Sequence, residues 1–377
     1  MTDAVATHPE STESTENTQS TGSTTSAERT EGAARDEGVE ARLERHRVEL
    51  TGYCYRMLGS PFEAEDAVQE TMVRAWRSFG TFEGRATLRS WLYRIATNVC
   101  LDMLGGSRRR ARPMDLASPV SPGVPLPDTL PEATWISPVP DGRVVPEGGD
   151  PAEVAVARES VRLAFVAALQ HLAPRQRAVL ILREVLAWRA SEVAELLGTT
   201  VASVNSALQR ARATLAARDV ADTVTVTSLD AELAALLARY VDAFEAYDLD
   251  ALTALLHEDA TLSMPPYGLW LRGHADIRGW LLGRGIGCRG SRLLPVVANG
   301  TPAFAQYRRD PSGAGHRPWA LQVLEITDGR IGGLNAFLDT DRLFPLFGLP
   351  PHLGECRGPS PEWANKWRRR AGAAGRS

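Results

Sequence analysis

The stretch that most constrains this fold runs from Arg189 to Leu215 and predicts two short helices joined by a tight turn. Ala194 is a small residue where the helices would cross, and Gly198 permits the left-handed backbone that ends the first helix. The second helix has an apolar stripe with helical spacing, at Val201, Val204, Leu208, Ala211 and Leu215. This arrangement is typical of a DNA-binding helix-turn-helix.

The outward face of the second helix carries small, hydrogen-bonding or cationic side chains: Ala202, Ser203, Asn205, Ser206, Gln209, Arg210 and Arg212. Amides and hydroxyls can bond to base edges in the major groove, whereas arginines suit phosphates. An ordinary helical hairpin has the same periodicity, so this segment alone leaves that alternative open.

The length of 377 residues predicts two or three domains. The four cysteines are scattered and form no CxxC pair, which indicates neither a zinc site nor a disulfide framework. No apolar run reaches the roughly 20 residues of a membrane span, and residues 1–38 lack the apolar core of a signal peptide. We therefore expect a cytoplasmic protein without a membrane partner.

The net charge of −4 averages segments of opposite sign. Residues 1–40 carry two arginines against nine acidic residues, and residues 113–151 carry one against six. By contrast, residues 42–112 carry thirteen arginines against eight acidic residues, and residues 152–218 carry nine against five. Two basic modules with acidic connectors suit a protein that touches a polyanion at two places, although a solvated basic face would look similar.

The two connectors have different compositions. Residues 1–40 are rich in Ser, Thr, Glu and Gly and have almost nothing to bury, which predicts disorder. Residues 113–151 are rich in Pro and Gly, which predicts a flexible or partly extended linker. Its apolar pair, Trp135 and Ile136, could dock elsewhere, but a loop with one exposed tryptophan is the preferred interpretation.

The pattern of the first basic module, residues 42–112, predicts a helical bundle. Ser60, Pro61 and Glu63 form a helix start, and the following helix is expected to bury Val68, Met72, Ala75, Trp76 and Phe79. A further helix over Thr87–Leu104 runs into an arginine cluster at 108–112. Such a cluster is a phosphate-contact patch, a localisation signal or a solubilising end.

Two segments resemble one family. The runs EAEDAVQETMVRAW and FEGRATLRSWLYRIATNVCLDMLGGSRRRARP are similar to the second conserved region of the extracytoplasmic-function (group IV) sigma-70 factors of bacterial RNA polymerase. The run LQHLAPRQRAVLILREVLAWRASEVAELLGTTVASVNSALQRARATL is similar to their fourth region. Two separate motifs in the right order make a chance match improbable and argue against the plain-hairpin alternative.

The resemblance implies residue roles in region 2. The acidic start of the second helix would dock on the clamp helices of the polymerase's largest subunit, through Glu65, Asp66, Gln69 and Glu70, although acidic residues also suit a helix N-terminus. The following loop and helix would melt the minus-ten element, with a stacking residue for the flipped base and cations for the strand. The candidates are Phe82, Arg85, Arg89, Arg94, Asn98, Arg108, Arg109, Arg110 and Arg112.

Region 4 would read the minus-thirty-five element with the second helix of its helix-turn-helix. The candidate DNA contacts are Thr200, Ser203, Asn205, Ser206, Gln209, Arg210 and Arg212. Many relatives have a basic residue where this chain has Ala202 or Asn205. The base sequence that this helix reads is therefore not implied by the family.

A third domain follows, with helices first and strand-like runs after them, over residues 226–350. This order predicts an α+β domain and resembles the SnoaL-like cone of the nuclear-transport-factor-2 superfamily. In sigma factors with this extension, the domain is thought to regulate the factor by packing on the sigma core. His274 and Asp339 would be the polar groups of the cone. One methionine and five aromatic residues would line or fill it: Met264, Tyr267, Trp270, Phe304, Trp319 and Phe337.

The expected architecture is multidomain: two all-α sigma domains at 41–112 and 152–218, the SnoaL-like domain, and a C-terminal tail at 351–377. The expected partners are RNA polymerase core and promoter DNA, with an anti-sigma protein or a small ligand at the SnoaL-like domain as a further option. No cofactor, metal or catalytic residue is expected. The alternatives are a helix-turn-helix regulator that never joins polymerase, and a DNA-binding module fused to a SnoaL-type enzyme.

Overall fold

The computed structural model describes residues 38–84, 86–106, 109–146, 148, 150–217, 231–313 and 315–354. Most of both terminal tails, together with Arg85 and Arg108, lies outside the described residues. Residues 38–44 form a helix of their own. Within these ranges, no helix is long and apolar enough to cross a membrane.

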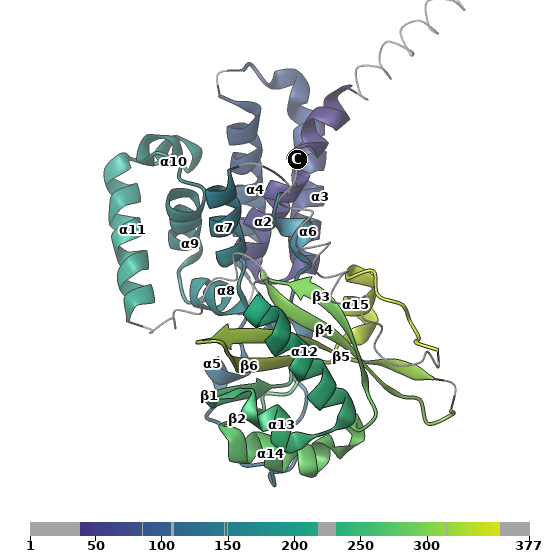
Figure 1. The fold of residues 1–377 in the computed structure, drawn as a ribbon. Helices are drawn as coiled ribbons and strands as arrows, with labels where there is room; N and C mark the ends of the chain where they lie inside the picture. Colours follow the sequence, from purple (N-terminus) through teal and green to yellow (C-terminus); the bar gives the residue numbers. More distant parts are fainter. Residues whose placement is uncertain are drawn as a thin grey trace, which may run out of the picture. The chain divides into compact units, whose positions relative to one another are not determined.

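The first helical module contains α2 (Arg47–Leu58), α3 (Pro61–Ser78), the short turn η1 (Phe79–Thr81) and α4 (Leu88–Leu104), shown in Figure 1. Ser60 and Thr87 cap α3 and α4 by accepting backbone N–H bonds from the first turn. In the core, the ring of Tyr53 packs edge-on against Tyr93 with centroids 5.2 Å apart, and its hydroxyl bonds to Thr97 at 2.8 Å. These contacts fix α2 against α4.

The proline-rich connector is docked along much of its length. It contains α5 (Pro113–Leu116), η2 (Glu132–Thr134) and α6 (Asp141–Val144). The backbone N–H of Val120 donates to the carbonyl of Trp270, and that of Leu130 donates to Pro266. Trp135 is only 3% exposed, so the expectation of a flexible linker with an exposed tryptophan is wrong for this segment. Composition did not show this because the partners of the connector lie far along the chain.

The connector also fits tightly onto α2. A Cβ atom at Gly52 would lie 2.4 Å from the carbonyl oxygen of Val144, so only glycine lets α6 approach α2 this closely. The two helices α2 and α6 are therefore held in direct backbone contact.

The second helical module contains α7 (Pro151–Glu159), α8 (Leu163–Gln170), α9 (Pro174–Leu180), the π-helical turn η3 (Ile181–Val185), α10 (Ala190–Leu196) and α11 (Val201–Ala216). Gly198 adopts a φ of 60° between α10 and α11, as the helix-turn-helix pattern requires. Val204, Leu208 and Ala211 are buried, which confirms the centre of the predicted inward stripe of α11. Val201 is 43% exposed, so the stripe does not include the first residue of the helix, where the expectation is wrong.

Two buried arginines join the helical modules. The Arg56 guanidinium donates to the Ser160 hydroxyl at 2.9 and 2.8 Å and to the Ala157 carbonyl at 3.0 Å. The Arg177 guanidinium donates to the side-chain oxygen of Gln170 at 2.7 Å and to the carbonyl of Met57. Burial lowers the pKa of both arginines to about 10. Carbonyl and hydroxyl acceptors therefore compensate these buried charges at the junction.

The C-terminal domain is α+β, as predicted. Its helices are α12 (Ala231–Ala246), α13 (Leu249–Ala254), α14 (His274–Leu282) and α15 (Thr340–Leu346), with the turn η4 (Arg284–Cys288). Its strands are β1 (Leu256–Ser263), β2 (Trp270–Arg272), β3 (Arg292–Ala298), β4 (Thr301–Arg309), β5 (His316–Thr327) and β6 (Arg330–Phe337). The sheet order is β2-β1-β6-β5-β4-β3, in which β1 and β6 are parallel and the other neighbours are antiparallel.

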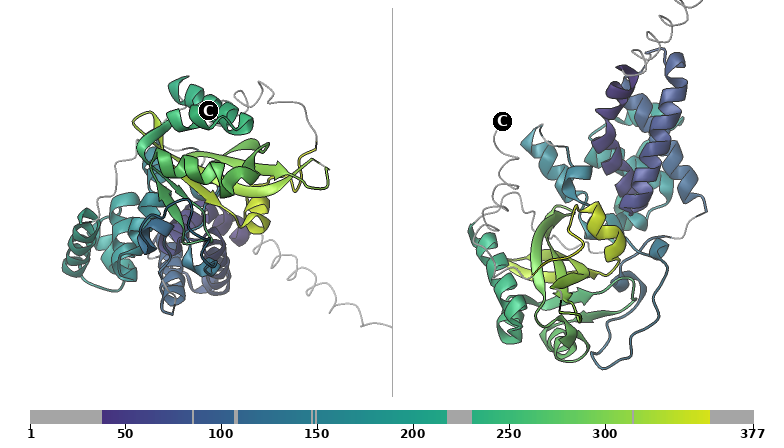
Figure 2. Two further views of the ribbon diagram at one scale, coloured as in Figure 1. Left: turned by 90° about the horizontal axis from the view of Figure 1, so that it is seen from below. Right: turned by 90° about the vertical axis from the view of Figure 1, so that its right-hand side faces the viewer.

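The helices α12, α13 and α14 cover one face of this sheet and enclose the core of the domain (Figures 1 and 2). Tyr240 packs against Phe304 with ring centroids 5.5 Å apart, and both side chains are fully buried. The short helix α15 packs on the sheet through Phe344, whose ring lies edge-on to Tyr307.

Candidate nucleic-acid interface

The exposed face of α3 carries most of the proposed polymerase contacts. Asp66, Gln69 and Glu70 are exposed, whereas Glu65 is partly buried and forms ion pairs with Arg47 at 3.3 Å and Arg143 at 3.5 Å. Arg143 belongs to α6, so the docked connector reaches the edge of this face. The face is thus acidic and largely open.

Trp76 differs from the sequence expectation. Its side chain is 50% exposed instead of buried, and it lies one and two helical turns beyond Met72 and Gln69 on α3. The expected Val68, Met72 and Ala75 are buried, together with Ala64, whereas Phe79 is only partly buried. Helical periodicity assigned this side chain to the core, whereas the structure places a large apolar side chain at the surface beside the acidic face.

Three aromatic residues cluster where α3 ends and α4 begins. The Phe82 and Trp91 rings have centroids 5.0 Å apart, and Phe79 lies 6.1 Å from Phe82 and 6.3 Å from Trp91. Phe82 and Trp91 are both partly exposed. Trp91 is thus part of a surface aromatic cluster that can stack with an unpaired base.

The cationic side chains of α4 contact the second helical module. Arg89 pairs with Glu49 at 2.7 Å and lies over the rings of Tyr93 and Trp188, at 5.1 and 5.5 Å from their centroids. Arg94 donates to the backbone carbonyl of Glu195 in α10 at 3.0 Å. Asn98 is exposed on the same helix. The surface proposed to hold the melted strand is therefore partly covered by the helix-turn-helix module.

The arginines of the cluster that follows α4 differ in burial and in their partners. Arg109 is exposed and lies 2.6 Å from a ring nitrogen of His171. Arg110 is 4% exposed and bonds to Glu63 at 2.7 Å, to Glu132 at 3.1 Å and to the carbonyl of Trp135. Arg110 therefore anchors the connector and is not a free DNA contact, contrary to expectation.

Arg112 is partly buried and pairs with Asp115 at 3.3 Å. The Arg112 guanidinium and backbone N–H hold the pKa of this carboxyl below its usual range, although burial alone would raise it. This arginine, like Arg110, is engaged at the start of the connector.

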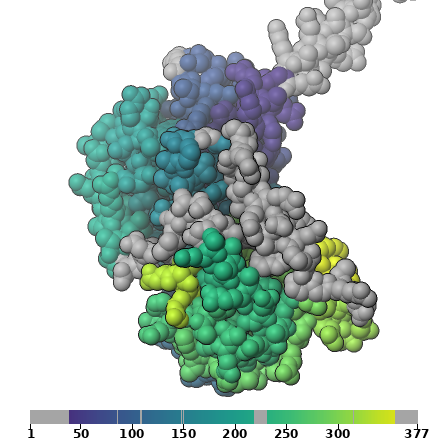
Figure 3. Space-filling model, viewed as in Figure 1, coloured from purple at the N-terminus to yellow at the C-terminus, as the bar shows by residue number. Residues whose placement is uncertain are grey.

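The recognition helix α11 is open. Thr200 caps it by accepting the backbone N–H of Ser203 at 3.2 Å. The α10–α11 surface is uncovered on the face that Figure 3 shows. The exposed residues on its leading side are Ala202, Ser203, Asn205, Ser206, Gln209 and Arg210.

Its two arginines are already engaged. Arg210 donates to the Ser206 hydroxyl at 2.7 Å, and Arg212 pairs with Glu184 of η3 at 2.6 Å. The two amide side chains, Asn205 and Gln209, lie one turn apart on the exposed side of α11.

The interior of the C-terminal domain contains a chain of buried hydrogen bonds. The Tyr240 hydroxyl donates to Gln322 at 2.6 Å, the Gln322 amide donates to Gln306 at 2.8 Å, and the Gln306 amide donates to Ser291 at 3.0 Å. These polar groups bind one another, and sequence reasoning did not single them out. The sequence feature that could have identified them is the presence of glutamine at inward positions of otherwise apolar strands.

The two polar residues expected in the cone lie apart. His274 begins α14, and its ring nitrogen is 3.0 Å from the carbonyl of His257. Asp339 directly precedes α15, makes no side-chain capping bond and lies 3.9 Å from Arg342. Trp319 lies under the guanidinium of Arg308 and does not line the core. The acid–base pair that the enzyme alternative would need is therefore not formed by these two residues.

The turn between β3 and β4 joins the C-terminal domain to both helical modules. Asn299 is fully buried and has a φ of 55°. Its amide donates to the Tyr55 hydroxyl at 2.7 Å and to the Val161 carbonyl at 2.6 Å, and its side-chain oxygen accepts the Val139 N–H at 3.0 Å. One side chain thus binds α2, the connector and the turn between α7 and α8 of the second module.

A carboxylate lies beside this turn. The Asp141 side chain accepts the backbone N–H of Gly300 at 2.8 Å, and burial raises its pKa to about 6. A Cβ atom at Gly300 would lie 2.7 Å from the Arg158 carbonyl oxygen, so the turn fits closely against α7. We call Asn299 and Gly300 the β3–β4 plug.

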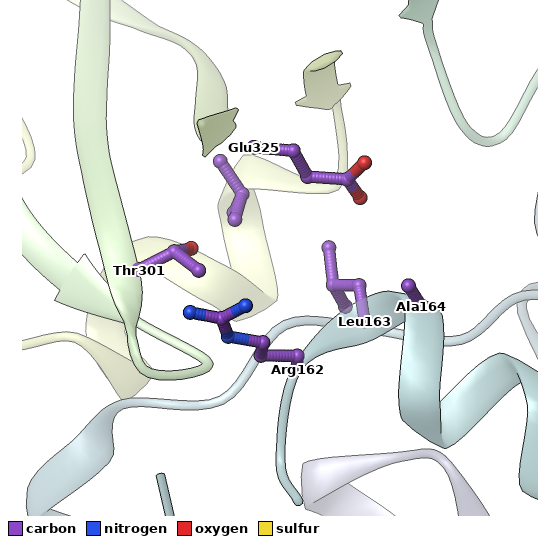
Figure 4. Close-up of a pocket in the computed structure, with 6 residues that line it drawn as sticks. Arg162, Leu163, Ala164, Thr301 and Glu325 are labelled. Atoms are coloured by element: carbon purple, nitrogen blue, oxygen red, sulfur yellow. The ribbon is translucent and has the colours of Figure 1, made fainter. Parts of the chain in front are cut away.

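A small cavity lies between the same domains, lined by Arg162, Leu163, Ala164, Thr301, Val323 and Glu325 (Figure 4). Its volume of about 10 Å³ is the space of roughly one water molecule. It cannot hold an organic ligand as it stands.

Three protein-family models match the chain. Sigma-70 region 2 matches residues 43–110, Sigma-70, region 4 matches residues 162–215, and the SnoaL-like domain matches residues 237–332. These are the three segments that the motifs indicated.

Individual relatives match most of the chain. It is 46% identical over 323 residues to the ECF RNA polymerase sigma factor SigG of Mycobacterium tuberculosis, which covers 83% of this chain and 84% of that protein. It is 29% identical over 311 residues to SigJ of the same organism, which covers 78% of this chain and 90% of that one. The crystal structure of Mycobacterium tuberculosis SigJ has a similar fold, with a TM-score of 0.53 at 24% identity over 82% of this chain and 99% of that chain.

Proposed function

We propose a regulatory role for the C-terminal domain of this chain, which belongs to the extracytoplasmic-function family of RNA polymerase sigma factors. In this proposal, the domain controls when the two DNA-binding modules separate. As a member of that family the protein binds RNA polymerase core and directs promoter recognition and transcription initiation. The observation that carries the proposal is the β3–β4 plug, where Asn299 bonds to Tyr55, Val139 and Val161.

Polymerase docking is assigned to the open face of α3, through Asp66, Gln69 and Glu70, with Glu65 at its edge. We add Trp76, because an exposed tryptophan beside complementary charges is the usual anchor of a protein interface. The partner surface would be the clamp helices of the largest subunit. Trp76→Ala should weaken core binding in a pull-down by about tenfold or more, whereas Arg77→Ala, at an exposed neighbour, should change it little.

Melting of the minus-ten element is assigned to the Phe79, Phe82 and Trp91 cluster and to the cations of α4. Stacking on aromatic rings holds an unpaired base, and arginines neutralise the released strand. In the arrangement described, Arg89 and Arg94 contact the second module, so strand capture requires that module to move away. The exposed residues Asn98 and Arg109 complete this surface.

Reading of the minus-thirty-five element is assigned to α11. Asn205 and Gln209 are the residues placed to contact base edges, with Ser203 nearer the N-terminus of the helix. Asparagine and glutamine pair best with adenine in the major groove, which predicts an A·T-rich element. The phosphate contacts would come from Thr200, Arg210 and Arg212.

The regulatory proposal is tested at the plug itself. Run-off transcription with reconstituted holoenzyme should compare the natural chain with Asn299→Gly, which removes the side chain but tolerates the positive φ. Higher transcript yield would show that the plug inhibits, and lower yield would show that it assists. An unchanged yield, with unchanged domain separation measured by fluorescence energy transfer, would refute a regulatory plug.

We do not assign catalysis to the C-terminal domain. Its buried polar groups bind one another, and His274 and Asp339 are not brought together. We place the protein in the cytoplasm, where core polymerase and promoter DNA are found. A small ligand or an anti-sigma protein would regulate the factor, in this proposal, by changing the contacts of the plug or of the α3 face.

A further inference from the structure

Five arginines gather at one end of the C-terminal domain, on η4 and on the β4–β5 hairpin: Arg284, Arg289, Arg308, Arg309 and Arg317. We call them the arginine patch. Residues 282–317 contain six arginines and one acidic residue, Asp310. The sixth arginine, Arg292, pairs with Glu245 at 2.7 Å. In the part of the chain that the structure describes, no ion pair involves the other five.

The strand register brings like charges together. Arg308 lies directly opposite Arg317 in the antiparallel pairing of β4 and β5, and Arg309 lies opposite His316. Like charges in facing positions destabilise a strand pair. The Arg308–Arg317 pairing therefore opposes the pairing of these two strands, and no acidic side chain forms an ion pair with either arginine in the described residues.

The Arg308 side chain is held in a fixed position by its neighbours. The Arg308 guanidinium lies 4.0 Å from the centroid of the Trp319 ring, and its Nε donates to the Gly287 carbonyl at 2.6 Å. A Cβ atom at Gly287 would lie 1.8 Å from the Arg308 guanidinium, so glycine is needed to leave room for it. The guanidinium is held by an aromatic ring and a carbonyl, and its charge is left unneutralised.

Further contacts join η4 to the hairpin. The Arg289 guanidinium lies 5.9 Å from the Tyr247 ring centroid. Arg309 Nε lies 3.8 Å from the position that a Cβ atom would take at Gly290. The exposed cations Arg289, Arg309 and Arg317 therefore lie on neighbouring segments.

We infer that the arginine patch binds the phosphate backbone of double-stranded DNA, as a contact additional to regions 2 and 4. Arginine binds phosphate oxygens in a bidentate manner and needs no base sequence to do so. Duplex DNA is the polyanion that lies close to this protein when it binds a promoter. The acidic residues 1–37 are the competing occupant within the same chain.

The test uses the full-length chain and a fluorescein-labelled 30-bp duplex without promoter elements, so it does not depend on promoter recognition. The double variant Arg309→Ala/Arg317→Ala leaves Arg308 on Trp319. In fluorescence anisotropy at low salt it should bind about tenfold more weakly than the natural chain. The slope of log affinity against log salt should fall by about 2, since each lost phosphate contact removes roughly 0.9.

Matched controls separate the patch from general charge. Arg272→Ala/Arg278→Ala removes two arginines of the same domain that pair with Asp259 and Asp250, and it should bind within about twofold of the natural chain. Arg309→Lys/Arg317→Lys should restore most of the affinity. Thermal unfolding of each variant checks that the domain remains folded.

The proposal is overturned if the patch variant binds like the paired-arginine control at every salt concentration. An effect that appears only after residues 1–37 are deleted assigns the patch to that acidic segment and overturns DNA as its occupant in the full chain. Loss of affinity with the expected change of slope, and its recovery with lysine, supports the proposal.

Discussion

The helices α4 and α11, to which we assign the two DNA contacts, differ in how far the rest of the chain covers them. On α4, Arg89 lies against Trp188 and Arg94 bonds to the carbonyl of Glu195, so the minus-ten surface is partly covered by region 4. On α11, Asn205 and Gln209 are exposed. The surface that we assign to strand melting is thus partly covered, and the surface that we assign to duplex reading is open.

This difference has a physical basis. Arg94 of α4 bonds to Glu195 of α10, so strand capture by α4, as proposed, requires the two modules to separate. The buried groups that oppose separation are Arg56, Arg177 and the β3–β4 plug, all of which bond to carbonyls or hydroxyls across domain boundaries. Each can be satisfied by water after opening, which suits a junction that must open.

The largest effect is expected from breaking the plug. Asn299→Gly removes three buried hydrogen bonds, together about 2–4 kcal/mol, so the closed arrangement should lose about 30-fold or more in population relative to the open one. Binding of a labelled A·T-rich single strand should rise accordingly, while duplex binding by α11 should not change. Equal gains on both substrates would contradict the contrast between α4 and α11.

The next effect concerns base choice by α11 alone. Asn205→Arg should shift the preferred base pair at one minus-thirty-five position from A·T to G·C, by about tenfold, because a bidentate contact discriminates by about 1–3 kcal/mol. Holoenzyme transcription from promoters randomised at both elements, followed by transcript sequencing, measures this. A library whose minus-ten preference changed instead would place Asn205 outside direct readout.

Low pH should weaken single-strand binding, which we assign to α4, by favouring the closed arrangement of the modules. The folded pKa of Asp141 is about 6, above its ordinary value, so protonation stabilises the closed arrangement as pH falls through 6, and this gain is absent at neutral pH. Single-strand binding should fall about fourfold from pH 7.5 to 5.5. Asp141→Asn should remove this pH dependence, and persistence of the dependence in that variant would assign it to another group.

The smallest effect is expected at an exposed ion pair. Glu184→Gln releases Arg212, which pairs with it at 2.6 Å, and frees this arginine for a phosphate. Duplex affinity should rise by about twofold, since exposed pairs contribute only about 0.2–1 kcal/mol. The double variant Glu184→Gln/Arg212→Ala serves as the control and should lose the gain.

Local pattern identified the helices and the residues that face outward on them. The caps at Ser60, Thr87 and Thr200 and the glycine at 198 are decided within a few residues, so they could be read directly. The order of helices and strands in the third domain followed in the same way. Trp76 was misassigned because helical spacing gives the direction of a side chain and not what covers it.

The sequence by itself determined the two sigma regions, the α+β extension and the open face of α11, because these depend on periodicity and near-neighbour hydrogen bonds. Only the tertiary structure decided that Arg110 is buried, that the connector is docked, and that Asn299 binds three segments. Those outcomes depend on pairs of residues tens to hundreds of positions apart. No local pattern records which distant carbonyl or carboxylate will meet a given side chain.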